Sequence, residues 1–149
     1  MQQSAQAVVL LDAYLEAGKE LQKKLKALQT PGNIMEVVKT FEDACIITGD
    51  NPNDAKFNIY GTIDEIAYLK LKVIAKALNG DVVLTYADPN QHKWYPWFQY
   101  SGSGFRFYDT DYDLSTTYTT GGSRLCFATQ KLAEYAGKQF IDLYNQFLN

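Results

Sequence analysis

Residues 93–112, KWYPWFQYSGSGFRFYDTDY, decide the fold. Aromatic residues fill two segments, 93–100 and 105–112, and such residues favour half-buried, pleated strands. The glycines of the connection at 101–104 are typical of a hairpin turn. The pattern therefore predicts two antiparallel strands joined by a short connection.

A third strand is predicted over 123–127, after the turn at Gly121-Gly122. Residues 86–127 hold 12 of the 21 aromatic residues in the chain, so most aromatic residues lie in the segment that is predicted to form the sheet. Pro96 has no N–H for a strand ladder, and the strand that contains it is expected at an edge or at a bulge.

Helices are predicted on both sides of this aromatic segment. Thr40 is a typical N-cap for a short helix that ends near Gly49. Thr62 and Glu65 fit a capping box, which predicts a helix ending at 79–80. Its apolar stripe is Ile63, Ile66, Leu69, Val73 and Ala77, widened by Ile74 and Leu78. A single final helix is predicted over about 130–147, with Leu132, Ala136, Phe140, Leu143 and Phe147 on its buried face.

The N-terminal segment 4–29 predicts one long helix whose apolar residues recur in alternating steps of three and four. These residues are Leu11, Tyr14, Gly18, Leu21, Leu25 and Leu28. The turn-forming residues at 30–33 separate this arm (1–30) from a single domain (34–149). The heptad-like spacing is consistent with self-association, and equally with a helix that lies on its own domain.

The whole pattern predicts an α+β fold. A small antiparallel three-stranded sheet packs on two or three helices, preceded by the N-terminal helical arm.

Composition narrows the function classes. The chain has 149 residues, a formal charge of −3 and a pI near 5.1, so its overall charge gives no reason to expect nucleic-acid or membrane binding. Cys45 and Cys126 have apolar neighbours and no metal-binding spacing, which predicts buried free thiols in a reducing compartment. Neither an export signal nor a membrane span is visible, so the expected location is the bacterial cytoplasm, or the virion if the protein is a phage component.

Several motifs together resemble a known family. They are Lys39-Thr-Phe-Glu-Asp-Ala-Cys45, Asp64-Glu-Ile-Ala-Tyr68, Leu71-Lys-Val-Ile74, Trp94-Tyr-Pro-Trp-Phe98, Ser101-Gly-Ser-Gly-Phe105, Gly122-Ser-Arg-Leu-Cys-Phe127 and Leu132-Ala-Glu-Tyr-Ala-Gly-Lys-Gln-Phe140. Over about residues 34–149 the chain resembles a family of small proteins, without an established activity, of gut Bacteroidales, their phages and their mobile elements. The resemblance implies a genomic setting and no mechanism, and the arm lies outside it.

No motif indicates catalysis. His92, the only histidine, is in a polar loop, and a pair with Cys126 is the weaker interpretation of both residues. Asp109, Asp111 and Asp113 start like a calcium loop, but Leu114 replaces its required glycine. The segment 102–104 lacks the Lys-Ser/Thr ending of a phosphate loop. We therefore expect no catalytic residue, cofactor or metal.

The aromatic strands suggest a binding face instead. Alternation along the strands places five residues on one side of the sheet: Tyr95, Trp97, Arg106, Tyr108 and Arg124. Flat rings beside cationic side chains suit stacking on a base, a sugar or a partner's side chain. The alternative is that the arm or a second subunit covers this face.

The sequence thus favours a non-enzymatic accessory protein of phage or mobile-element type. It would act by protein–protein contact and self-associate through the arm, within a larger assembly. The alternative is a module that binds a small, nucleotide-like ligand on the aromatic and arginine face, for example in phage–host conflict. Nucleic acid is a weaker candidate because the three aspartates of 109–113 would repel phosphates.

Overall fold

The computed structural model describes residues 2–28, 34–119 and 122–149. These residues form six α-helices, two 3-10 helices and one two-stranded antiparallel sheet, so the fold is mixed α+β as predicted. The chain divides into two compact units, Met1–Val37 and Val38–Asn149.

The first unit contains α1 (Gln2–Leu28) and α2 (Ile34–Val37). The long helix predicted over 4–29 is thus present to Leu28, and the predicted break at 30–33 lies outside the described residues. In the described part of the chain, no helix is both long enough and apolar enough to cross a membrane.

The second unit begins with the short helix that the Thr40 cap predicts. In α3 (Phe41–Thr48), Thr40 Oγ1 accepts the N–H of Asp43 at 3.1 Å, and the Asp43 carboxylate accepts the N–H of Thr40 at 3.1 Å. Gly49 ends the helix at φ 77°, a left-handed conformation that favours glycine. The ring of Phe41 packs 5.0 Å from that of Phe57, in the 3-10 helix η1 (Ala55–Phe57).

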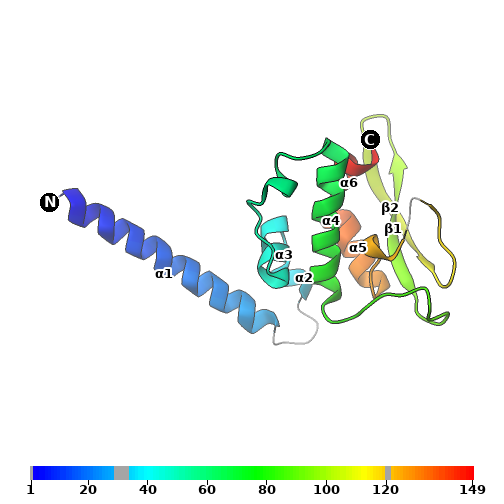
Figure 1. The fold of residues 1–149 in the computed structure, drawn as a ribbon, viewed down its shortest axis with the longest axis horizontal. Coiled ribbons are helices and arrows are strands. Elements are labelled where there is room, and N and C mark those ends of the chain that lie inside the picture. Colours follow the sequence, from blue (N-terminus) through cyan, green and yellow to red (C-terminus); the bar gives the residue numbers. More distant parts are fainter. Residues whose placement is uncertain (1, 29–33, 120–121) are drawn as a thin grey trace. The chain divides into compact units, whose positions relative to one another are not determined.

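Helix α4 (Ile63–Asn79) is the central element of this unit and lies between α3 and α6 (Figure 1). The predicted capping box begins it, with the Glu65 carboxylate accepting the N–H of Thr62 at 2.7 Å. The predicted stripe is only partly right, because Ile63 is exposed whereas Leu71, outside the stripe, is fully buried.

Strands β1 (Lys93–Tyr100) and β2 (Phe105–Asp113) form the predicted hairpin. Their register runs from Lys93 opposite Asp113 to Tyr100 opposite Phe105. The register shifts once, because Trp97 faces Asp109 while Phe98 faces Phe107. Tyr108 is therefore the extra residue of a β-bulge.

The third strand predicted at 123–127 is not formed. Residues Ser123–Leu125 form the 3-10 helix η2, and only Phe127 pairs with β1, through two backbone hydrogen bonds to Trp94. The Asn79 side chain explains the difference, because it accepts the N–H of Ala128 at 2.8 Å and donates to Cys126 O at 2.9 Å. These bonds hold the segment against the end of α4 rather than along β1.

The single final helix predicted over 130–147 is two helices, α5 (Gln130–Gln139) and α6 (Ile141–Leu148). The backbone leaves helical geometry at Phe140, which has φ −108° and ψ 28°. Helix α5 packs mainly on the two strands, whereas α6 packs mainly on α4 and also contacts the hairpin. The break lets consecutive segments serve two different neighbours.

Candidate functional site

The two faces of the hairpin have different roles. Pro96 and Phe107 face α5, where a Cβ at Gly137 would lie 2.7 Å from each side chain. Phe98 faces α6, with its ring 4.6 Å from that of Tyr144. Because side chains alternate along a strand, we expect Tyr95 and Trp97 on the other face.

Tyr95 and Trp97 line an aromatic pocket of about 210 Å³ between β1, segments 113–118 and 122–126, and the end of α6. Leu125 and Cys126 form part of its opposite wall, on the side of β1 where Phe127 pairs with Trp94. The aromatic pocket therefore lies beside β1, on the side where Phe127 pairs with Trp94. Its six aromatic lining residues are Tyr95, Trp97, Phe98, Tyr118, Tyr144 and Phe147.

Neutral groups dominate the aromatic pocket. Burial, followed by the nearby charge of Asp113, raises the pKa of the Cys126 thiol to about 12, and the thiol donates to Gly122 O at 3.2 Å. Desolvation likewise raises the pKa of Tyr95 and that of Tyr144. The polar lining includes Asp113 and Thr117, which offer acceptors to a ligand N–H.

The thiols are buried and free, as predicted, and the pKa of Cys45 is raised to about 11, mainly by burial. The ring of His92 is tilted against that of Tyr112, with 4.4 Å between ring centroids, and it stacks on Trp94 at 5.9 Å. The Cys126 thiol donates to the backbone carbonyl of Gly122, and His92 contacts aromatic rings. These contacts provide no nucleophile–base pair between His92 and Cys126.

The other three residues of the predicted binding face do not line the aromatic pocket. Arg106 donates to Gln99 Oε1 at 2.9 Å, and Tyr108 is exposed at the bulge. Arg124 lines a different pocket. The five residues predicted as one face therefore do not share a pocket.

Acidic residues occupy the outer face of the hairpin beside the pocket aromatics. Asp109 lies opposite Trp97, and Asp111 lies opposite Tyr95. These aspartates belong to β2 rather than to a calcium loop. Over residues 2–28, 34–119 and 122–149, no group of three or more His, Cys, Asp or Glu side chains is arranged to hold a metal ion.

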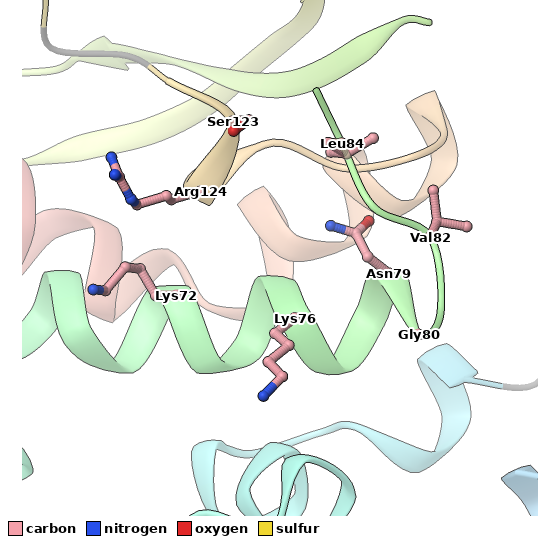
Figure 2. A pocket seen from close by; sticks show the side chains of 8 residues that line it. All are labelled: Lys72, Lys76, Asn79, Gly80, Val82, Leu84, Ser123 and Arg124. Atoms are coloured by element: carbon pink, nitrogen blue, oxygen red, sulfur yellow. The ribbon is translucent and has the colours of Figure 1, made fainter. Parts of the chain in front are cut away.

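A second pocket, of about 250 Å³, is cationic (Figure 2). Lys72 and Lys76 come from successive turns of α4, and Ser123 and Arg124 come from η2. Figure 2 shows Lys72 and Arg124 extending in the same direction, whereas Lys76 extends toward the other side of α4. Among the residues that the structure describes, no acidic side chain lines this cationic pocket.

Helix α1 carries the residues predicted for self-association. Leu11, Tyr14, Leu21 and Leu25 are exposed by 58, 70, 43 and 49%, and the side chain of Leu28 lies outside the described part of the chain. Four further apolar residues of the same helix are exposed by more than half: Val8, Val9, Leu10 and Leu15. The exposed apolar surface of α1 is thus wider than the predicted stripe.

Sequence reasoning missed the cationic pocket and most of the aromatic one. The four-residue spacing of Lys72 and Lys76 was a visible signal, since such residues lie on one side of a helix. Nothing in the sequence placed Arg124 beside them, because η2 was expected to be a strand. Tyr118 and Phe147 come from segments far from β1 in sequence, so no local pattern joins them.

Comparisons with protein-family models, with curated proteins and with solved structures found no match to this chain.

Proposed function

We propose that this chain is a non-enzymatic, self-associating protein whose α1 helices pair with those of other copies. The observation that carries the proposal is the series of large apolar side chains exposed along α1. Exposed apolar surface on this scale typically marks an interaction site. The resemblance to small phage and mobile-element proteins motivates an accessory role within a larger assembly.

The width of the apolar surface suggests how many helices meet. A two-stranded coiled coil buries a narrow seam, whereas a helix that is apolar on several sides is buried by several neighbours. Between residues 8 and 15, α1 exposes Val8, Val9, Leu10, Leu11, Tyr14 and Leu15. We therefore expect bundles of three or more α1 helices.

Light scattering on the full chain tests this proposal. The unaltered protein should have a mass of several chains, against 16.9 kDa for one. The double variant Leu11→Gln and Leu21→Gln should approach the mass of one chain, because it places amides within the apolar stripe while retaining good helix formers.

The matched control is Glu16→Gln with Lys23→Gln. It introduces the same residue twice into the same helix and leaves the net charge unchanged. In the described part of the chain, the Glu16 side chain forms an exposed ion pair with Lys19, which contributes little. An unaltered chain that is monomeric at every concentration would overturn the proposal, as would a control that dissociates like the stripe variant.

A second candidate function rests on the aromatic pocket. The aromatic pocket has a volume of about 210 Å³ and is lined by six rings and by the acceptors of Asp113 and Thr117. This lining suits a small planar molecule that carries N–H groups. A nucleobase has this chemistry. The ligand-binding proposal therefore keeps Tyr95 and Trp97 and omits Arg106, Tyr108 and Arg124.

Saturation-transfer NMR with adenosine as the probe tests this candidate. Trp97→Leu should abolish the transfer, because Trp97 lines the pocket. Tyr108→Leu is the control, since Tyr108 is an exposed aromatic residue of the same hairpin outside the pocket. Equal loss in both variants, or no transfer to the unaltered chain, would remove nucleobase binding.

A further inference from the structure

We infer that Lys72 and Arg124, which line the cationic pocket, bind the phosphate group of a small phosphorylated molecule. This site is separate from α1 and from the aromatic pocket, and it does not depend on self-association.

The charge of the cationic pocket is unusual for this chain. The protein has a net charge of −3, yet three cationic side chains and no carboxylate line this pocket. The side chains of Lys76 and Arg124 make no hydrogen bond or ion pair with any described residue. Lys72 lies 5.0 Å from the ring centroid of Tyr68, a contact that uses its charge but not its three N–H donors.

The walls of the pocket are held in place by other residues. Asn79, which also lines the pocket, bonds to the backbone of Cys126 and Ala128. These bonds attach the segment after η2 to the end of α4, so Arg124 is kept beside Lys72. A guanidinium can donate two parallel hydrogen bonds to a phosphate, and a lysine adds a mobile positive charge. The hydroxyl of Ser123 is a further donor at the same wall.

The size and lining of the pocket favour a small ligand. A volume of about 250 Å³ is at the lower limit of the roughly 300–1,000 Å³ range of ligand pockets. Val82 and Leu84 provide an apolar wall for the part of the ligand that carries the phosphate. A nucleic-acid strand would instead need a longer basic track, and the exposed aspartates of β2 oppose one.

The test is calorimetric titration of the full chain with inorganic phosphate and with ribose 5-phosphate, at constant ionic strength. Both should bind saturably, whereas ribose and sodium chloride should not. Lys72→Gln and Arg124→Gln should each weaken binding by about tenfold, the effect of losing one charge-assisted hydrogen bond. Circular dichroism would verify that both variants fold, as expected for changes in partly or fully exposed side chains.

Lys131→Gln is the matched control, because it removes one positive charge from an exposed position on α5. It should bind phosphate as the unaltered chain does. Equal weakening by this control would overturn the site in favour of a general charge effect. The absence of saturable binding would overturn it outright, and binding of a single-stranded oligonucleotide without either phosphate probe would assign the surface to nucleic acid.

Discussion

Single residues determine how closely the elements of the second unit approach one another. Gly137 lies on the face of α5 that meets the hairpin, and a Cβ at this position would lie 2.7 Å from Pro96 and from Phe107. Lys93 is fully buried, and its ammonium donates to Thr85 O at 2.9 Å and to Gln91 O at 2.6 Å. Lys93 therefore joins the preceding loop to the start of β1 through two charge-assisted hydrogen bonds.

The substitution Gly137→Ala should destabilise the second unit by about 1–3 kcal/mol, the typical cost of overpacking. Helix propensity alone would predict the opposite sign, a gain of up to about 1 kcal/mol. Urea denaturation followed by tryptophan fluorescence would measure the change, because both tryptophans are in β1.

Gly18→Ala is the control for this prediction. Gly18 is also helical, but nothing lies within 4 Å of a Cβ at that position. The control should leave the urea midpoint of the tryptophan signal unchanged. A stabilised Gly137→Ala variant would show that α5 and the hairpin do not approach this closely.

At the scale of elements, local signals in the sequence were good predictors. The caps at Thr40 and Thr62 predicted the starts of α3 and α4, because capping depends on residues within one turn. The aromatic alternation predicted both strands of the hairpin. Each of these predictions needed only a short stretch of chain.

The elements that were predicted wrongly depend on distant partners. Segment 123–127 has the composition of a strand, yet Asn79, nearly fifty residues earlier, holds its end against α4. Asn145 of α6 donates to Phe105 O and accepts from its N–H, as a neighbouring strand would. No local pattern reveals such contacts, so the strand count and both pockets could not be predicted.

At the scale of the whole molecule, the two units differ in how far their apolar residues are buried. Apart from Val37, every buried apolar residue of the described chain belongs to Val38–Asn149, including Phe57, Leu71 and Phe127. In α1, by contrast, the apolar residues from Ala5 to Leu25 are exposed. The second unit therefore has a core of its own, whereas α1 has apolar surface suited to a partner.

A fragment of residues 34–149 should consequently fold without α1. We expect its free energy of unfolding to lie within about 0.5 kcal/mol of that of the same unit in the Leu11→Gln, Leu21→Gln chain, since changes outside a core usually have effects of this size. Urea titration with tryptophan fluorescence would compare the two under identical conditions. A fragment that fails to fold, or loses several kcal/mol, would show that α1 completes the core of its own domain. Its apolar residues would then have an intramolecular partner, and their exposure would no longer support self-association.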